Sequence, residues 1–219
     1  MTLARTRLPA EARRAAVIDA ALRVFSDGSY SGATTADIAR EAGVSEPILY
    51  RHFGCKRDLY LACIDDAWVR LRSAVEEGVA AESDPGAWPL AVAKVLQRRD
   101  RRLPVHLWIQ AVSQAGEDPE VRRFLRRHMK EVHFFFAGLM RRSQEAGGIP
   151  PDRDPDTEAW IGLGVGLLRS VQDALGGLLT TEDFEAIAAS RKAWLTGQSP
   201  LSEAVAAEAR RDAREAKSD

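Results

Sequence analysis

The sequence predicts an all-α protein, in which a small N-terminal three-helix domain precedes a larger helical domain. Apolar residues recur at helical spacing along nearly the whole chain, and Gly- or Pro-containing breaks separate these runs. Strand-like alternation and hairpin dipeptides do not stand out. Of the 219 residues, 45% are hydrophobic, which is enough for a sizeable core and too many for a disordered chain.

The first element is expected from about Pro9 to Ser26, where one face carries an apolar stripe that includes Val17, Ile18 and Phe25. A second helix begins near Thr34, whose hydroxyl stands three residues before Asp37 in a capping-box-like arrangement. This helix places Ile38, Ala39 and Ala42 on one face. The segment therefore predicts two short helices packed against the first.

A sharp turn between the second and third helices is predicted at Gly43, because glycine adopts the left-handed conformation easily. Ser45 can cap the third helix, and Pro47 fits its first turn. Leu49 and Phe53, four residues apart, fall on the inner face. The outer face is left with Ile48 and a row of Tyr50, Arg51 and His52, followed by Lys56, which suits contact with DNA better than a plain helical hairpin. A hairpin without DNA-binding function is the alternative.

The stretch TTADIAREAGVSEPILYRHFGCK, residues 34–56, closely resembles the helix–turn–helix of the TetR family of bacterial transcriptional repressors. Upstream, Ile18 to Ala21, Phe25 and the Gly28–Tyr30 segment extend the resemblance, which covers about the first quarter of the chain in detail. It implies a homodimer that binds a palindromic double-stranded DNA operator and responds to a small-molecule effector.

The third helix is expected to enter the major groove, which is wide enough to admit a helix. Glu46 can accept from a cytosine amino group, Pro47 and Ile48 can contact thymine methyls, and Arg51 can reach guanine or a phosphate. The resemblance implies phosphate contacts from Tyr50, His52, Lys56 and a hydroxyl near Thr34 or Thr35. The predicted DNA-binding residues are Thr34, Thr35, Ser45, Glu46, Pro47, Ile48, Tyr50, Arg51, His52 and Lys56.

Beyond the turn, all remaining elements also read as helices. The clearest break is Ser83–Gly86, and a second stop falls at Gly147–Pro151. The predicted domains are 1–55 for DNA binding, 56–198 for effector binding and dimerisation, and 199–219 as a polar tail that is either helical or frayed. Helices are expected at about 56–80, 88–96, after Pro104, 120–145, 156–175 and 182–195.

The helix predicted at 156–175 is apolar on most sides and carries Gly162, Gly164 and Gly166, which suits burial against a closely packed partner helix. In the family, the last two core helices pair with their counterparts as a four-helix dimer interface. The interface residues expected here are Trp160, Leu163, Leu167, Val171, Phe184, Ile187, Arg191 and Trp194.

Family members usually carry an effector pocket in the larger domain, and a mostly apolar cavity with a few polar groups would suit a partly apolar small molecule. Filled core is the alternative, because an aromatic stripe at helical spacing is common in cores. The candidate lining residues are Trp88, His106, Trp108, Gln110, Gln114, His133, Phe135, Phe136 and Gln172.

The charge distribution and the cysteine content restrict the functions that the chain can have. The net charge is −1, and residues 1–60 carry nine Lys/Arg against seven Asp/Glu, so DNA binding must rest on where the charges are placed. Cys55 and Cys63 match no zinc spacing, and no metal or cofactor is expected. The sequence shows neither a secretory signal nor an apolar stretch of membrane-spanning length, and a cytoplasmic protein without membrane association is expected.

Two other function classes are alternatives to a ligand-released repressor. A DNA-binding protein without a small-molecule effector, controlled by a protein partner or acting architecturally, remains an open alternative. An enzyme is not expected, because no nucleophile–base arrangement, metal spacing or phosphate loop is apparent.

Overall fold

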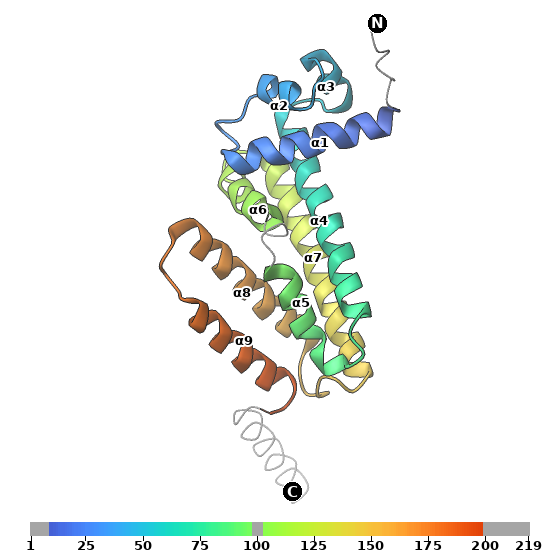
Figure 1. The fold of residues 1–219 in the computed structure, drawn as a ribbon, viewed down its shortest axis with the longest axis vertical. Helices are drawn as coiled ribbons and strands as arrows, with labels where there is room; N and C mark the ends of the chain where they lie inside the picture. The colour runs from blue at the N-terminus through green and yellow to red at the C-terminus, as the bar shows by residue number, and fades with distance from the viewer. Residues whose placement is uncertain (1–8, 98–102, 199–219) are drawn as a thin grey trace, which may run out of the picture. The chain divides into compact units, whose positions relative to one another are not determined.

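The structure is a computed structural model that describes residues 9–97 and 103–198 (Figure 1). All regular elements in these two ranges are helical, which confirms the predicted all-α class. The bounds expected for the helices agree with the observed ones to about one residue. In chain order, the elements are α1 (Ala10–Asp27), α2 (Thr35–Glu41), α3 (Glu46–His52), α4 (Lys56–Ala80), the 3₁₀ turn η1 (Pro85–Ala87), α5 (Trp88–Gln97), α6 (Leu103–Gln114), α7 (Pro119–Glu145), α8 (Pro155–Leu175) and α9 (Thr181–Leu195).

The chain divides into two compact units, and both α4 and α7 contribute residues to each of them. The first unit draws on 1–73 and 99–129, and the second on 74–98 and 130–219. These units are not the functional domains expected from the sequence, and the boundary at residue 55 stays a prediction. The C-terminal tail and the basic run at 98–102 lie outside the described residues.

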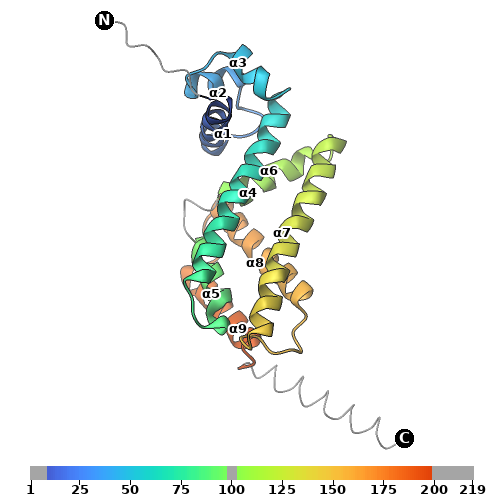
Figure 2. The ribbon, with the colours of Figure 1, turned by 90° about the vertical axis from the view of Figure 1, so that its right-hand side faces the viewer.

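The core of the first unit joins α1–α3 to α4 and α6. Phe25 meets Tyr60 edge to face at 4.8 Å between ring centroids, and Tyr30 lies 4.7 Å from the same ring. The Tyr60 hydroxyl donates to the carbonyl of Leu107 at 2.7 Å, which ties α4 to α6. Burial raises the pKa of Tyr60, so the phenol stays protonated and keeps this bond at neutral pH. Figure 2 views α1 nearly end-on, with α2 beside it.

The turn between α2 and α3 forms as the sequence predicts. Gly43 has φ 64°, and its N–H bonds to the carbonyl of Arg40 while the N–H of Val44 bonds to that of Ala39. This is the hydrogen-bonding pattern of a Schellman motif, in which the left-handed residue allows the chain to leave the helix sharply. Leu49 is fully buried in the core of the first unit, so α3 is held from its inner face.

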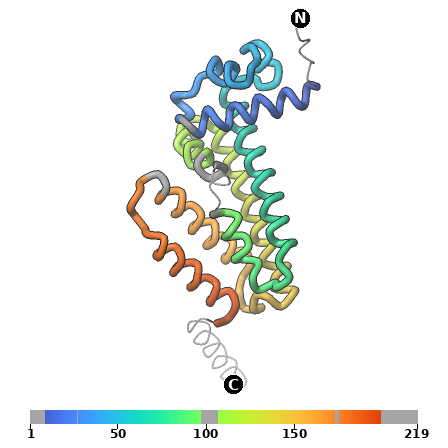
Figure 3. The backbone as a smooth tube through the Cα atoms, in the orientation of Figure 1, coloured from blue at the N-terminus to red at the C-terminus, as the bar shows by residue number. Residues whose placement is uncertain are grey.

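In the second unit, α8 and α9 run antiparallel and are joined by a short loop at 176–180 (Figure 3). Buried Glu158 of α8 accepts from the indole Nε1 of Trp194 at 2.7 Å and forms an ion pair with Arg191. Buried Arg153 lies 3.8 Å above the Trp194 ring and donates to the Trp194 carbonyl. These polar contacts fix α9 against α8.

A glycine is required where the loop after α7 meets η1. A Cβ at Gly148 would stand 2.3 Å from the carbonyl carbon of Pro85 and 2.4 Å from the amide nitrogen of Gly86. Neither backbone atom can move aside easily. Ser143 strengthens this contact, because its hydroxyl donates to the Pro85 carbonyl at 2.7 Å. The loop at the end of α7 is therefore held directly against η1.

Candidate nucleic-acid interface

The outer face of α3 carries polar side chains, while its inner face is held by Leu49. Tyr50 is 47% exposed, and Arg51 is exposed beside it. Ser45 and Pro47 are also exposed, whereas Glu46, Ile48 and His52 are half-buried. The sequence-predicted residues of α3 therefore lie on a short helix with its polar side chains accessible. The fixed inner face gives these side chains a rigid base.

The two threonines before and at the start of α2 have different partners. Thr34 caps α2: its hydroxyl accepts from the N–H of Asp37 at 3.1 Å and contacts the Asp37 carboxylate at 2.5 Å. Thr35 instead reaches α3, where its hydroxyl donates to Glu46 Oε1 at 2.7 Å and lies 3.2 Å from the Tyr50 hydroxyl. The structure thus groups Thr35, Glu46 and Tyr50 and leaves Thr34 with its capping role.

Ser45 occupies the predicted N-cap position of α3, but its hydroxyl makes no capping hydrogen bond. Its backbone carbonyl accepts from the N–H groups of Ile48 and Leu49 instead. The expectation that the Ser45 side chain caps α3 is therefore wrong. Pro47 lies in the first turn, as predicted, where its missing N–H leaves no helical hydrogen bond unmade.

Lys56 binds within the first unit as well as standing at the start of α4. Its ammonium donates to the carbonyls of Tyr30 at 2.9 Å and Ala33 at 3.1 Å, and it lies 4.5 Å from the Tyr30 ring centroid. An ammonium has three N–H donors, so the two carbonyls leave one for a phosphate. Lys56 thus holds the loop before α2, a role that sequence reasoning missed.

The neighbouring Arg57 links the start of α4 to the start of α7. It bonds to Asp118 at 3.1 Å and forms ion pairs with Asp58 and Glu120. The pKa of the Asp118 carboxyl is lowered by the backbone N–H of Glu120 and by Arg57. The Asp118-Pro119-Glu120 sequence signals a helix start, but no local pattern indicates that Arg57 is its partner.

The predicted effector-pocket residues fall in both compact units, and a shared pocket stays a prediction. Trp108, Gln110 and Gln114 belong to the first unit, while the Trp88, His133, Phe135, Phe136 and Gln172 positions belong to the second. The side chain of His106 lies outside the described residues.

Several of these pocket candidates have structural partners. Gln110 Oε1 accepts from the N–H of Tyr30 at 3.1 Å, and Gln172 Oε1 accepts from the N–H of Leu179 at 2.7 Å. His133 stacks on Trp160, with ring centroids 4.2 Å apart. Phe136 is buried.

Two buried ring nitrogens in the first unit stand out. Trp108 Nε1 and His128 Nδ1 are each buried without a hydrogen bond among the described residues. His128 Nδ1 lies 3.5 Å from Asp65 Oδ1, and the His128 ring stacks on Phe124. The indole Nε1 of Trp108 is always a donor, and a buried donor left unpaired costs about 1–3 kcal/mol. Sequence analysis named Trp108 and missed His128.

The predicted interface residues divide between exposed and internal positions. Trp160 and Val171 of α8 are 48% and 39% exposed. Phe184 is buried beneath Arg169, whose guanidinium lies 4.1 Å from the ring centroid. Arg191 and Trp194 bind Glu158 within the unit. Leu163, Leu167 and Ile187 are half-buried.

Two parts of the chain match known protein families. Residues 17–63 match the family of bacterial regulatory proteins, tetR family, and residues 89–163 match the BetI-type transcriptional repressor C-terminal domain. A TetR-family structure from Rhodococcus sp. superposes with a TM-score of 0.73 and 21% identity, over 85% of this chain and 99% of that one. At this identity the likeness shows the fold.

Curated relatives are named regulators. The chain is 36% identical over 115 residues to the transcriptional regulator BetI of Rhizobium meliloti strain 1021, covering 52% of this chain and 57% of BetI. It is 41% identical over 78 residues to the transcriptional activator FasR of Mycolicibacterium smegmatis, covering 36% of each. An uncharacterised regulator of Bacillus subtilis, YezE, is 30% identical over 135 residues, covering 58% of this chain and 68% of YezE.

The chain belongs to the TetR family, as its helix–turn–helix residues predicted. This is a family of regulators and not of enzymes, in agreement with the sequence analysis. The matches span a little over half of BetI and about a third of FasR. None of the described helices is both long and apolar enough to cross a membrane.

Proposed function

We propose that the protein is a cytoplasmic transcriptional repressor that binds a palindromic DNA operator as a homodimer and is released by a small-molecule effector. The observation that carries the proposal is α3. Its inner face is anchored by fully buried Leu49, and Tyr50 and Arg51 are exposed on its outer side, next to half-buried His52. A helix with this distribution can enter the major groove without losing its own packing.

The DNA contacts proposed for individual residues follow from their chemistry. Arg51 is the side chain best suited to guanine or a phosphate, because its guanidinium presents several N–H donors in a fixed plane. Tyr50, His52 and the remaining N–H of Lys56 would bind phosphates. Phosphate contacts position the helix, whereas Glu46, Pro47 and Ile48 near its start would face base edges.

Dimerisation through α8 is supported by the apolar surface of that helix. Trp160, Ile161, Val171 and Leu175 are all more than a third exposed. Gly164 shares this face, and a Cβ added there would meet no atom outside the helix's own backbone within 4 Å in a single copy. A second α8 can therefore approach closely, and a two-fold pair of α3 helices would match an inverted-repeat operator.

Release by an effector is supported by two buried nitrogens, Trp108 Nε1 and His128 Nδ1, that have no hydrogen-bond partner within the described part of the chain. The larger functional domain proposed at 56–198 contains both. Because α4 contributes to both compact units, a change along this helix can reach α3. An effector that favours one arrangement of the dimer would then lower the affinity for the operator.

The sign of regulation is proposed from the C-terminal match. Residues 89–163 resemble a domain named for repressors, whereas the match to the activator FasR covers a smaller part of the chain. The alternative function is DNA binding without a small-molecule effector, controlled by a protein partner or used architecturally.

Selection of duplexes from a random library at moderate salt tests the proposal directly. Purified protein should retain a short inverted repeat, which then serves as the operator for effector screening. Diffuse retention that disappears with salt would show phosphate binding only. That result would favour the architectural alternative over the repressor.

A further inference from the structure

Three side chains at the front of the helix–turn–helix form one hydrogen-bonded group. Glu46 and Tyr50 stand four residues apart on α3 and share a face, and Thr35 begins α2. Thr35 Oγ1 lies 2.7 Å from Glu46 Oε1 and 3.2 Å from the Tyr50 hydroxyl. Thr35 therefore connects the carboxylate to the phenol.

The protons in this group can be assigned by counting donors. A carboxylate only accepts, and each hydroxyl carries a single proton. The Thr35 proton must therefore point to Glu46. Thr35 then accepts in its contact with Tyr50, so the Tyr50 proton points to Thr35. Both hydroxyl protons are directed inward, along a chain that ends at Glu46.

This direction conflicts with phosphate binding. Phosphate oxygens, like carboxylate oxygens, only accept hydrogen bonds, so neither hydroxyl can donate to DNA while the chain to Glu46 is intact. The negative charge of Glu46 also stands beside hydroxyls that would approach a phosphate, which adds repulsion. Glu46 therefore weakens binding to any duplex that does not offer its carboxylate a hydrogen-bond donor.

We propose that Glu46 makes phosphate contact conditional on the base sequence. The inference rests on the DNA-binding function proposed above. The duplex feature that Glu46 requires is an exocyclic amino group at the base edge, the N4 amino group of cytosine or the N6 amino group of adenine. This amino group replaces Thr35 at the carboxylate, and the hydroxyls of Thr35 and Tyr50 turn to the phosphates. Base recognition and phosphate binding are then coupled through one residue.

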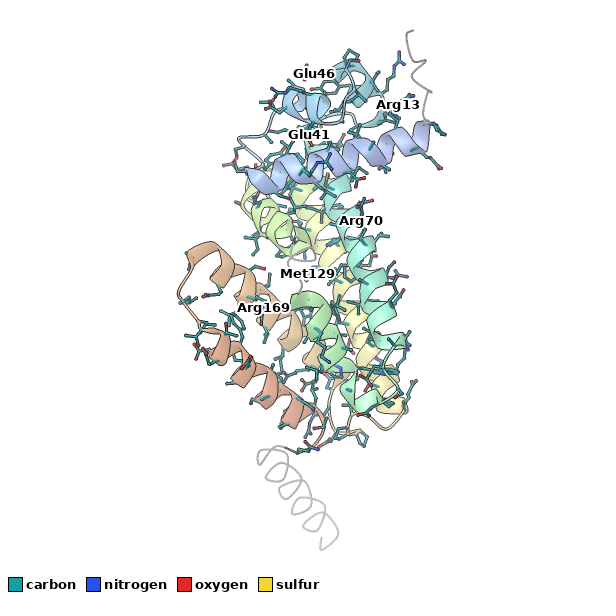
Figure 4. All side chains as sticks on the ribbon, viewed as in Figure 1. Arg13, Glu41, Glu46, Arg70, Met129 and Arg169 are labelled. Atoms are coloured by element: carbon teal, nitrogen blue, oxygen red, sulfur yellow. The ribbon has the colours of Figure 1, made fainter. Side chains whose placement is uncertain are left out.

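Thr34 shows why the coupling involves Thr35. The Thr34 hydroxyl accepts from the Asp37 N–H and contacts the Asp37 carboxylate, so both of these contacts lie within the N-terminal cap of α2. Thr35 has no such local partner and contacts only α3 residues in the bonds described above. The position of Glu46 at the outer end of the α2–α3 pair can be followed in Figure 4, where Glu41 lies toward α1.

A double-mutant cycle between Glu46 and Tyr50 tests the proposal. Affinity is measured by fluorescence anisotropy at one salt concentration for the wild type, Glu46→Ala, Tyr50→Phe and the double variant. Each protein is tested on the duplex selected by the wild type and on a scrambled duplex of the same composition. Circular dichroism and thermal unfolding confirm that each variant is folded.

On scrambled DNA, Glu46→Ala should bind about fivefold more tightly than the wild type, because both hydroxyls become donors to phosphate. Tyr50→Phe should change wild-type affinity there by less than about twofold, yet weaken Glu46→Ala by about fivefold. On the selected duplex, Glu46→Ala should lose at least about tenfold in its preference over scrambled DNA.

Two further variants separate charge from hydrogen bonding. Glu46→Gln removes the charge but keeps an acceptor. Adding Tyr50→Phe to Glu46→Gln should therefore change the affinity for scrambled DNA by less than about twofold. Glu41→Ala removes one negative charge from α2, where Glu41 pairs with Arg23, and should leave the preference unchanged.

An equal cost of Tyr50→Phe with and without Glu46 would overturn the coupling while leaving DNA binding intact. An unchanged preference in Glu46→Ala would do the same. If no variant binds any duplex, the proposed function fails, and the coupling fails with it.

Discussion

Helices α3 and α8 distribute their polar and apolar side chains in opposite ways. On α3 the apolar residue Leu49 is buried and the polar residues lie outside. On α8 the carboxylate of Glu158 is buried, while large apolar side chains such as Ile161 and Leu175 are exposed. The difference indicates partners of different chemistry: a charged and hydrated surface for α3, and another apolar surface for α8.

The same contrast separates two uses of polar residues. In the second unit, Glu158, Arg191 and Trp194 satisfy one another inside a single copy and hold two helices together. Around α3, Glu46, Thr35 and Tyr50 also satisfy one another, but at an accessible surface. The first group should matter for stability, and the second for the choice of DNA sequence.

The largest expected effect comes from a charge placed on the exposed apolar face of α8. Val171→Glu places a charge on the exposed face of α8, and two-fold symmetry brings two such charges into one interface. Dimer affinity should fall by about a thousandfold or more, because uncompensated buried charges cost several kcal/mol. Sedimentation across a concentration series measures the loss.

The matched control is Val69→Glu, which introduces the same charge at an exposed valine of α4. It should leave the association state unchanged. Equal dissociation in both variants, or in neither, would show that the α8 surface is not the interface.

The internal polar group provides the next test. Glu158→Ala leaves Arg191 and the indole of Trp194 without their acceptor, and should lower the free energy of unfolding by about 3 kcal/mol. Urea unfolding followed by circular dichroism gives this difference. The exposed Glu185 of α9 supplies the control, since Glu185→Ala should cost less than about 0.5 kcal/mol. Similar losses in the two variants would remove the structural role of Glu158.

On the α3 side, Arg51→Ala should weaken binding to the selected duplex by about tenfold, since a base or phosphate contact from arginine is worth about 1–3 kcal/mol. Stability should not change, because Arg51 is exposed. Anisotropy titration compares it with Arg126→Ala, at an exposed arginine of α7. Unchanged affinity in Arg51→Ala would remove this residue from the interface.

Acidification should weaken the capping box at the start of α9. The backbone N–H and the hydroxyl of Thr180 lower the pKa of the Asp183 carboxyl within a capping box. A lowered folded-state pKa means that Asp183 contributes stability above its unfolded pKa and loses it as the pH falls through the folded one. The advantage of the wild type over Asp183→Ala in thermal unfolding should be present at pH 6 and shrink below about pH 4. A constant difference across this range would contradict the cap.

The smallest effect concerns the two thiols. Burial raises the pKa of Cys63, which is fully buried, whereas Cys55 is half-buried between α3 and α4. A thiol reagent at neutral pH should therefore modify Cys55 in the folded protein and Cys63 only after unfolding. In Cys55→Ser the remaining thiol is Cys63. Rapid modification of Cys63 in the folded variant would contradict the prediction, because it would show that the surrounding core opens.

Local signals explain why the helices and the Gly43 turn could be predicted. Apolar spacing, Gly43, Thr34 and Pro47 each act within a few residues of their own position, so the sequence displays them directly. Partners that lie far apart in the chain are different. Nothing near Lys56 indicates the carbonyls of Tyr30 and Ala33 as its acceptors.

The candidate sites show the same limit. The side chains of α3 were predicted as outward-facing, but their links to Thr35 depend on how α2 and α3 cross. Arg191 and Trp194 were predicted at the dimer interface from the family resemblance and the helical stripe, neither of which shows that Glu158 binds both. The predicted pocket residues come from both compact units, and helical spacing alone does not show which of them share a cavity.

The most direct test of the central comparison is duplex selection with the wild type and Val171→Glu in parallel, followed by sequencing of the retained DNA. The wild type should retain an inverted repeat with fixed half-site spacing. The variant should retain a single half-site weakly, or nothing, because α3 is intact but the pair is lost. If both proteins select the same inverted repeat, or if the wild type selects an unsymmetrical site, α8 does not set the pairing of the two α3 helices.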